Sequence, residues 1–346
     1  MSDRVESSTA SPSGGKSPSA EQGGAPLVEG VLAIPGEWPL HHGGKLHDVR
    51  LAWRLAGAPT APLVCAMGGV WCDRRLYEPG DPRRGCWHGI VGPGRPLDAD
   101  RNRILSFDYL AGKGDSTGPE PGGELPAIST YDQAEALARL LDHLHIREVR
   151  AIVGGSYGGM VALAFAERYP ERVGALVTVS AADVAHPMAV AWHSIQRRIV
   201  RFAIACGRGP EGLRLARGVG MATYRSSEEF AARFPATPRL ESGRYVFPVE
   251  HYLFGDDSES VEGFRPESFL ALSQSLDLHH VDAARIFVPT AAVAAREDQL
   301  VPLSDIRALG ARLGNARVHE ISSIYGHDAY LREAEQLRRV LAAWPA

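Results

Sequence analysis

Residues 149–161 read VRAIVGGSYGGMV: a short apolar run, a glycine-rich turn around one serine, and the start of a second apolar pattern. Residues 151–153 are typical of a buried strand, whereas residues 160–165 repeat apolar side chains at the spacing of a buried helix face. A strand must therefore become a helix within about two residues. Such a turn is crowded, and the glycines on both sides of Ser156 leave room for its backbone.

Ser156 is the central residue of a Gly-x-Ser-x-Gly pattern formed by residues 154–158. In this pattern the serine hydroxyl stands above the edge of a sheet, at the N-terminus of a helix, and can act as a nucleophile. The Tyr157 amide has no acceptor inside the helix and can donate to a developing oxyanion. The alternative is a glycine-rich turn with an ordinary serine. The strand before the turn and the helix after it favour the catalytic interpretation.

Size, composition and charge limit the kind of protein. The 346 residues, 45% hydrophobic and 23% charged, suffice for one large globular domain with an insertion. The formal net charge is only −4 and the arginines are dispersed, so no nucleic acid partner is expected. No apolar run approaches the ~18 residues of a membrane-spanning helix, and the first residues lack the basic start and apolar core of a signal peptide. We therefore expect a cytoplasmic protein without a membrane partner.

The cysteines are Cys65, Cys72, Cys86 and Cys206. They are too few for a disulfide scaffold and too far apart for a Cys-x-x-Cys motif. We expect free thiols in a reducing cytoplasm, and no metal site is predicted.

Strand and helix patterns alternate along most of the chain, which predicts an α/β fold with a mostly parallel, doubly wound sheet. Residues 27–180 and 283–346 carry this pattern, after a tail at residues 1–26 that has too few large apolar side chains to be ordered. In residues 181–282 helical segments follow one another without a clear core strand, as expected of a lid inserted between two strands.

The predicted strands are 27–34 and 47–55, which form a leading hairpin, then 62–67, 103–110, 151–153, 173–180, 286–294 and 317–321. The predicted core helices are 131–145, the helix that follows Ser156, 304–313 and 328–341, and the predicted lid helices are 188–206, 212–222 and 266–276.

A serine hydroxyl is a weak nucleophile, so the catalytic interpretation requires a histidine base and a carboxylate that orients it. In folds with this turn, the acid and then the histidine follow the serine along the chain. Asp298 lies just beyond the strand that ends near residue 294, and His327 lies between the last strand and the last helix. Both loops leave the same edge of a parallel sheet as Ser156. Glu297 is the alternative acid.

Two further parts of the predicted site are the choice of the histidine base and the second oxyanion amide. The late histidines His279, His280 and His319 do not lie in a loop after the final strand. A second oxyanion amide is expected from Met67 or Gly68, because the buried strand 62–67 ends there at a pair of glycines. A simple glycine turn is the alternative.

The chain resembles the homoserine O-acyltransferases of methionine biosynthesis, of the MetX type, which have the α/β-hydrolase fold with an inserted helical lid. The resemblance runs from about residue 43 to residue 341. Its most specific segments are GGSYGG at 154–159, VGPG at 91–94 with Leu97-Asp98, STGP at 116–119, Tyr224-Arg225-Ser226 and Gly326-His327-Asp328.

The resemblance implies that an acyl-CoA acylates Ser156 and that the side-chain hydroxyl of L-homoserine then attacks the acyl-enzyme. No cofactor is implied, because acyl-CoA is a co-substrate. Arg225 is implied to bind the amino-acid carboxylate and Asp328 its ammonium group, roles that suit a guanidinium and a carboxylate. Without the resemblance, Arg225 would be a surface arginine and Asp328 a helix cap.

The resemblance also implies a homodimer paired through the lids. Apolar lid residues that one insertion would leave partly uncovered suit this pairing: Leu213, Leu215, Phe230 and Phe234. The alternative is that they form the core of the lid itself.

The acyl donor and the acceptor stay open at this point. A succinyl group ends in a carboxylate that requires a cation or several hydrogen bonds, whereas an acetyl group requires only a small apolar end. Leu300 is not a cation, and the candidates for this role are Arg296, Arg197, Arg198 and His193. L-serine is an alternative acceptor, and water would make the protein a serine hydrolase of the same fold.

Overall fold

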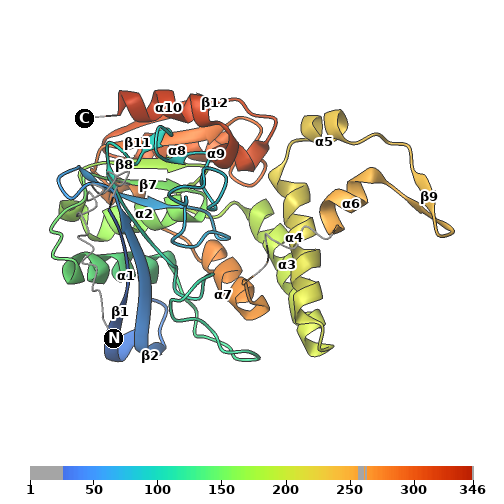
Figure 1. Cartoon of the computed structure of the whole chain (residues 1–346), viewed down its shortest axis with the longest axis horizontal. Helices are drawn as coiled ribbons and strands as arrows, with labels where there is room; N and C mark the ends of the chain where they lie inside the picture. The colour runs from blue at the N-terminus through green and yellow to red at the C-terminus, as the bar shows by residue number, and fades with distance from the viewer. Residues whose placement is uncertain (1–25, 256–260, 262, 345–346) are drawn as a thin grey trace, which may run out of the picture.

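The computed structural model describes residues 26–255, 261 and 263–344, so nearly all of the predicted tail lies outside the described residues. Its centre is an eight-stranded sheet in the order β1-β2-β6-β3-β7-β8-β11-β12 (Figure 1). β1 and β2 form the predicted antiparallel hairpin, and β2 pairs antiparallel with β6. All further neighbours in the sheet are parallel. The predicted α/β architecture with a mostly parallel sheet is therefore confirmed.

The strands of this sheet are β1 (Leu27–Pro39), β2 (Lys45–Ala56), β3 (Leu63–Met67), β6 (Arg103–Phe107), β7 (Ala151–Gly155), β8 (Leu176–Val179), β11 (Thr290–Ala295) and β12 (Ala316–Ile321). A separate pair joins β4 (Val91–Gly92) to β5 (Leu97–Asp98). The helices outside the insertion are α1 (Thr130–His143), α2 (Tyr157–Arg168), α8 (Leu303–Arg312), α9 (Ala329–Arg332) and α10 (Ala334–Ala343).

The central strand β3 shows why a continuous apolar run belongs in the middle of this sheet. Its side chains alternate between the two faces. Cys65 and Met67 join the core cluster that contains the buried faces of α1 and α2. Val64 and Ala66 join a second cluster, which contains residues of α10. Helices thus cover both faces, and a strand buried on both sides has no polar alternation.

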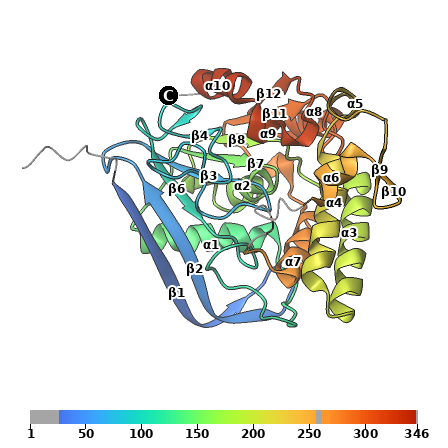
Figure 2. The same cartoon turned by 45° about the vertical axis from the view of Figure 1, so that its right-hand side comes forward.

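The insertion leaves the sheet after β8 and returns before β11. It contains α3 (Pro187–Ala205), α4 (Gly209–Tyr224), α5 (Ser227–Arg233), β9 (Arg239–Glu241), β10 (Arg244–Val246), α6 (Pro248–Phe254) and α7 (Pro266–Asp277). In Figure 2, α3, α4 and α7 stand together on the side of the molecule opposite the β1–β2 hairpin. The segment with α5, α6 and β9 projects away from the sheet (Figure 1).

The two ends of the insertion are tied together at its base. β8 and β11 are neighbours in the sheet. Beyond them, Val184 and His280 form an antiparallel bridge, and the Val281 amide donates to the Asp183 carbonyl at 2.9 Å. The insertion therefore begins and ends at one point of the sheet.

The structure differs from the predicted secondary structure at several places, among them the last helix and the insertion. The last helix, predicted as one piece over 328–341, is divided into α9 and α10 because the backbone of Glu333 (φ −87°, ψ 55°) is not helical. The insertion contains the hairpin β9–β10, which was not predicted. Ser242 and Gly243 between its strands both have positive φ, 49° and 81°, as a two-residue hairpin turn requires.

The expectation of four free thiols is wrong for two of them. Cys72 and Cys86 form a disulfide, with their Cα atoms 5.4 Å apart. Cys65 and Cys206 are free, the first buried and the second exposed. A pairing across 14 residues depends on how the intervening loop folds back, and spacing alone does not reveal it.

No helix in the part of the chain that the structure describes is long and apolar enough to cross a membrane.

Candidate active site

Ser156 lies at the tight turn between β7 and α2, with φ 52° and ψ −120°. A positive φ is strained for a residue with a side chain. The glycines around it are required by close approach: a Cβ on Gly154 would lie 2.3 Å from the Gly158 carbonyl oxygen, and one on Gly158 would lie 2.1 Å from that of Met67. This tight turn places the Ser156 side chain beyond the end of β7, where it lines a cavity.

His327 and Asp298 meet Ser156 at the carboxyl edge of the sheet. His327 lies in a short 3-10 turn after β12, and Asp298 lies in the loop after β11. The distance from His327 Nε2 to Ser156 Oγ is 2.9 Å, and that from His327 Nδ1 to Asp298 Oδ2 is 2.8 Å. The three residues predicted to act together are thus joined by hydrogen bonds. A serine, a base in contact with it and an acid behind the base are the parts of a nucleophilic triad.

The second oxygen of Asp298 is also held in place. Asp298 Oδ1 accepts hydrogen bonds from the amides of Leu300 at 2.9 Å and Val301 at 3.0 Å. The neighbouring Glu297 accepts from the Ser322 hydroxyl and from the Ser323 amide instead. Asp298, and not the alternative Glu297, is therefore the acid that contacts the histidine.

The surroundings of His327 shift its basicity upward. Burial lowers the pKa of His327, but the charge of Asp298, the hydrogen bond to it and the charge of Asp328 together raise the pKa above the ordinary value of 6.5. A base must be neutral to accept a proton. Since the pKa of His327 is raised, half of the His327 side chains become neutral only at a pH above 6.5.

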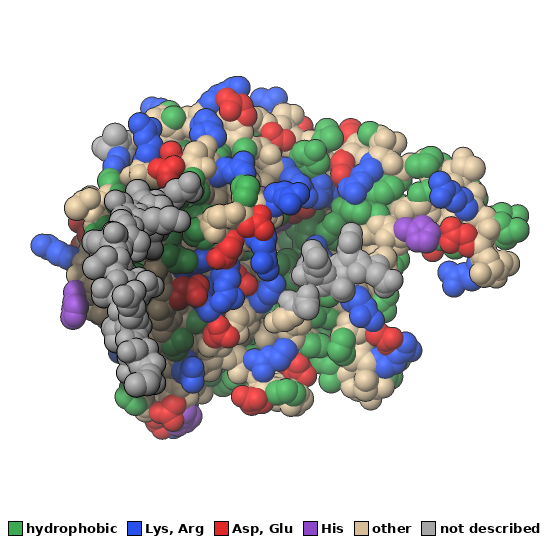
Figure 3. Space-filling model, in the orientation of Figure 1, with side chains coloured by type: hydrophobic (Ala, Val, Ile, Leu, Met, Phe, Trp, Pro, Cys, Tyr) green, Lys and Arg blue, Asp and Glu red, His purple; other side chains and the backbone are tan. Residues whose placement is uncertain are grey.

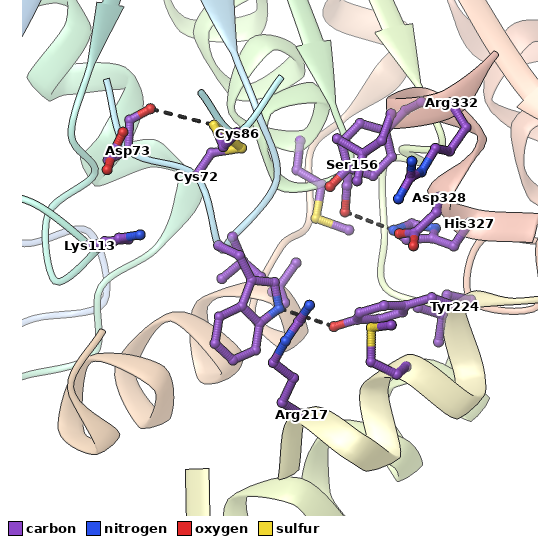
Figure 4. A pocket seen from close by; sticks show the side chains of 18 of the residues that line it. Cys72, Asp73, Cys86, Lys113, Ser156, Arg217, Tyr224, His327, Asp328 and Arg332 are labelled. Carbon is purple, nitrogen blue, oxygen red and sulfur yellow. Dashed lines mark hydrogen bonds between the residues drawn. A yellow bond between two sulfur atoms is a disulfide. The ribbon is translucent and has the colours of Figure 1, made fainter. Parts of the chain in front are cut away.

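The cavity around these residues has a volume of about 1520 Å³. Figure 4 shows Ser156 and His327 on one side of it and Arg217 and Tyr224, from α4 of the insertion, on the other. Within the described residues, no group of three or more His, Cys, Asp or Glu side chains is placed to hold a metal ion.

The two residues predicted to bind an amino acid lie in direct contact with each other. Arg225 Nε is 3.0 Å from Asp328 Oδ2, and Arg225 Nη1 is 3.4 Å from Glu229 Oε1. Both members of the Arg225–Asp328 pair are buried, and Asp328 lines the cavity whereas Arg225 is not among its lining residues. The role of Arg225 in binding a substrate carboxylate stays a prediction.

Arg217 is the arginine of the insertion that lines the cavity, and the sequence interpretation missed it. Its guanidinium carbon lies 5.2 Å from the ring centre of Trp71, within cation–π range. A signal was present in the sequence: Arg217 precedes Tyr224 by seven residues, two helical turns, so both side chains lie on the same face of α4.

The cationic residues predicted to bind a succinyl carboxylate differ in whether they line the cavity. Arg296 is exposed outside the cavity and pairs with Glu320, at 3.4 Å. Arg197 Nη2 lies 2.6 Å from Asp277, and Arg197 also donates to the Ser273 carbonyl. His193 lines the cavity, with its Nδ1 2.7 Å from Asp277. Arg296, the first candidate, is therefore in the wrong place for this role.

The residues predicted for the oxyanion hole surround the same turn. Tyr157 is the first residue of α2, where an amide has no acceptor within the helix. Met67 ends β3 and pairs with Gly154, and Gly68 follows it. A Cβ on Gly69 would lie 3.7 Å from that of Ser156, so this loop runs beside the nucleophile. The assignment of the donors stays a prediction.

A serine, a histidine and an aspartate joined in this way at the carboxyl edge of a mostly parallel sheet define an enzyme of the α/β-hydrolase fold. Residues 85–334 match the family model described as alpha/beta hydrolase fold. The chain is 40% identical over 326 residues to a homoserine O-succinyltransferase of Xanthomonas campestris, covering 94% of this chain and 85% of that protein. The chain belongs to the homoserine O-acyltransferase family.

Two other relatives differ in the acyl group or the acceptor that their names give. A homoserine O-acetyltransferase of Thermus thermophilus is 37% identical, with 87% of each chain covered. A serine O-succinyltransferase of Litchfieldella anticariensis is 32% identical, with 93% of this chain and 99% of that protein covered.

Solved structures with the same fold include both acyltransferases and esterases. A homoserine O-acetyltransferase from Bacillus anthracis has a TM-score of 0.81 at 17% identity, covering 91% of this chain and 96% of that chain. Esterase E22 has a TM-score of 0.80 at 18% identity, covering 91% and 100%. At such identities these likenesses show the fold alone.

Proposed function

We propose that this protein transfers an acetyl or succinyl group from acyl-CoA to the side-chain hydroxyl of L-homoserine through an acyl-enzyme on Ser156. The observation that carries the proposal is the hydrogen-bonded array of Ser156, His327 and Asp298 in a chain 40% identical to a homoserine O-succinyltransferase. The proposed reaction uses no cofactor besides the acyl-CoA co-substrate. A cytoplasmic location stays a prediction from the sequence.

The proposed chemistry has two halves that use the same base. His327 takes the Ser156 proton as the hydroxyl oxygen attacks the thioester carbonyl, and then gives the proton to the departing CoA thiolate. The homoserine hydroxyl next gives its proton to His327 and attacks the acyl-enzyme carbonyl. Ser156 leaves as an alkoxide and recovers the proton from His327. The amides of Tyr157 and the Met67–Gly68 loop hold the oxyanion in both halves.

The main competing function is hydrolysis, because a serine, histidine and acid joined in this way also serve hydrolases and an esterase shares the fold. The test is the release of CoA from acetyl-CoA or succinyl-CoA, followed with a thiol reagent with and without L-homoserine. We expect release to depend on homoserine, and intact-mass spectrometry without acceptor to show one added acyl group. A release rate indifferent to homoserine would identify a hydrolase, and no acyl adduct from either thioester would contradict the covalent mechanism.

We further propose that Arg217 binds the homoserine carboxylate and Asp328 its ammonium group, with Arg225 holding Asp328 in place. Arg217 and Asp328 both line the cavity that contains Ser156. The Arg225 guanidinium is engaged by two buried carboxylates, those of Asp328 and Glu229. A buried, paired guanidinium is suited to orient a carboxylate that faces the substrate.

Replacing Arg217 with leucine should raise the KM for homoserine about ten- to a hundred-fold, since a charge-assisted contact contributes ~1.5–3 kcal/mol. The rate of acyl-enzyme formation should change little, because that half-reaction precedes acceptor binding. Arg233→Leu is the matched control. Arg233 is another arginine of the insertion and pairs with Glu229, but it is half-exposed and does not line the cavity. An unchanged KM in Arg217→Leu would return the role to Arg225.

The donor and the acceptor are distinguished by competing substrates. The names of the relatives reported above give succinyl or acetyl as the transferred group and homoserine or serine as the acceptor. Comparing kcat/KM for succinyl-CoA and acetyl-CoA, each with homoserine and with serine, identifies the physiological pair. Because Arg296 pairs with Glu320 outside the cavity, Arg296→Leu should leave the donor ratio unchanged.

We also propose a homodimer that pairs through the insertion. Of the residues that suggested it, Leu213 is buried and Phe230 and Phe234 pack against Tyr252, whereas Leu215 is 49% exposed. Stronger support comes from the projecting hairpin, where Figure 3 shows hydrophobic side chains at the tip. The exposed apolar side chains of the insertion include Phe202 at 75%, Tyr245 at 69% and Leu240 at 65%. Large apolar side chains that are exposed in this way are a feature of protein interfaces.

Light scattering at micromolar concentration should give twice the chain mass of 37.3 kDa. Phe202→Asp together with Tyr245→Asp should shift the molecule toward the monomer. A wild-type protein with the monomer mass would contradict the dimer.

A further inference from the structure

The loop after β3 is fastened by its Gly68 carbonyl group. This oxygen accepts two hydrogen bonds, one from the Tyr109 hydroxyl at 2.7 Å and one from the Gly158 amide at 3.1 Å. Gly158 belongs to the first turn of α2, and Tyr109 follows the end of β6. The carbonyl is thus directed at the first turn of α2 and at the segment that follows β6.

A fixed carbonyl also fixes the amide of the next residue. The peptide between Gly68 and Gly69 is planar and trans, so its N–H points opposite to its C=O. With the carbonyl turned toward Tyr109 and Gly158, the Gly69 amide faces away from them. Gly69 itself lies beside Ser156, because a Cβ there would be 3.7 Å from the serine Cβ. The orientation of this peptide therefore determines which backbone donors face the nucleophile.

The far side of the same loop is tied down independently. The Cys72 amide donates to the Gly69 carbonyl at 2.9 Å, and the Cys72 side chain is bonded to Cys86. Figure 4 shows this disulfide at the wall of the cavity. The disulfide and this hydrogen bond hold the loop beyond Gly69, while Tyr109 and Gly158 hold the Gly68–Gly69 peptide. Two glycines in sequence would otherwise let this peptide rotate, since neither has a side chain.

The Tyr109 ring is held so that its hydroxyl cannot easily leave the carbonyl. The residue is 2% exposed and packs edge-on against Tyr157 and Phe107, at ring-centre distances of 4.9 and 5.6 Å. Burial, with smaller contributions from neighbouring groups, raises the pKa of Tyr109 well above 10, so the phenol stays a donor. A preformed donor array is effective because it need not reorganise as charge develops.

We propose that Tyr109 is a positioning residue for the oxyanion hole: its hydroxyl orients the Gly68–Gly69 peptide so that the Gly69 amide, one residue beyond the Met67 and Gly68 amides expected from the sequence, faces the carbonyl carried by Ser156. This inference rests on the proposed acyl-enzyme chemistry and adds to it a residue that touches no substrate. Both tetrahedral intermediates, on the way to the acyl-enzyme and from it, use the same hole. Loss of the hydroxyl therefore slows both half-reactions.

The test is Tyr109→Phe, which removes one hydroxyl and keeps the ring. Acylation of Ser156 by p-nitrophenyl acetate, followed as a burst of p-nitrophenol, should slow about ten-fold, a fraction of the ~10²–10³ lost when an oxyanion donor is removed outright. The affinity for an alkyl boronic acid, whose serine adduct mimics the tetrahedral intermediate, should fall by a similar factor. The KM for homoserine should stay the same, a separation that simple loosening of the fold would not produce.

Tyr169→Phe is the matched control, because its hydroxyl also donates a hydrogen bond, to the partly buried Glu135 carboxylate, and neither residue lines the cavity. It should keep the wild-type burst and boronate affinity. Thermal melting verifies folding, and Tyr109→Met, which fills the space without a donor, replaces Tyr109→Phe if that variant does not fold.

The outcomes separate this inference from the function it rests on. A wild type without a burst would contradict the acyl-enzyme mechanism and this inference with it. A wild-type burst with an equal rate in Tyr109→Phe would overturn the positioning role alone. A parallel loss of burst rate and of homoserine affinity would also overturn it, because that result indicates general damage to the site.

Discussion

Replacement of Ser156 by alanine should lower kcat for acyl transfer by about 10⁴- to 10⁶-fold, the range for removing the nucleophile of such a triad. The proposed mechanism forms its covalent intermediate on this oxygen, and alanine leaves His327 without a proton to accept. The fold should persist, because alanine has a Cβ like serine and the Ser156 side chain does not cap α2. Initial rates of CoA release and the thermal midpoint measure the two effects separately.

Ser180 provides an unusually close control for this substitution. It is buried at the end of β8, the strand next to β7, and its φ is also 52°. It does not line the cavity. Ser180→Ala should therefore retain the wild-type kcat and thermal midpoint, a result that would show that alanine is tolerated at a positive φ in this sheet. An acyl adduct that still appears in the mass spectrum of Ser156→Ala would place the nucleophile elsewhere.

The second large effect is expected at the acid. Asp298→Asn should lower kcat by about 10⁴-fold, as loss of the charge lets the histidine adopt the wrong tautomer. Asp298 accepts from the Nδ1 side of His327, so that Nε2 is free to accept the Ser156 proton. An amide in its place can donate to Nδ1 and leave the proton on Nε2, where it blocks proton transfer from the serine.

The same variant should also change the pH dependence. In the wild type, kcat/KM should rise with pH through a midpoint above 6.5, because Asp298 and Asp328 outweigh the effect of burial on the pKa of His327. Removing the charge of Asp298 leaves burial less opposed, so the midpoint of the residual activity should move to lower pH. Glu297→Gln is the control: its carboxylate binds Ser322 and Ser323, so neither rate nor midpoint should change. A midpoint that stays in place in Asp298→Asn would mean that another group sets it.

The parts of the site that could be predicted from the sequence are those governed by local rules. The apolar run at β7, the glycines and the helical pattern after them place Ser156 at a sheet edge, and parallel topology brings the loops of Asp298 and His327 to the same edge. Contacts made across the fold were not predictable in this way. The Cys72–Cys86 disulfide and the pairing of Arg225 with Asp328 depend on where separate loops lie in space.

Two of the missed features left signals that were weak for physical reasons. The two-residue turn at Ser242 and Gly243 joins strands of only three residues each, too short for an alternating pattern to stand out. Arg217 shares a helix face with Tyr224, but an arginine on an amphipathic helix is usually solvated. Its position in the cavity depends on how α4 packs against the other helices of the insertion and against the turn that carries His327.

The bridge between Val184 and His280 has a meaning for how such enzymes diversify. Because the two ends of the insertion meet there, the insertion can change without altering the path of the chain through the sheet, although contacts such as the Arg225–Asp328 ion pair also hold it against the core. Closing a loop twice as long costs only ~0.6 kcal/mol more, so the insertion can lengthen, shorten or be rebuilt at little expense to the scaffold. β8 and β11 pair directly with each other, with no strand of the insertion between them in the sheet. The same sheet edge can therefore be combined with different insertions, in keeping with the presence of both an esterase and an acyltransferase among the solved structures of this fold.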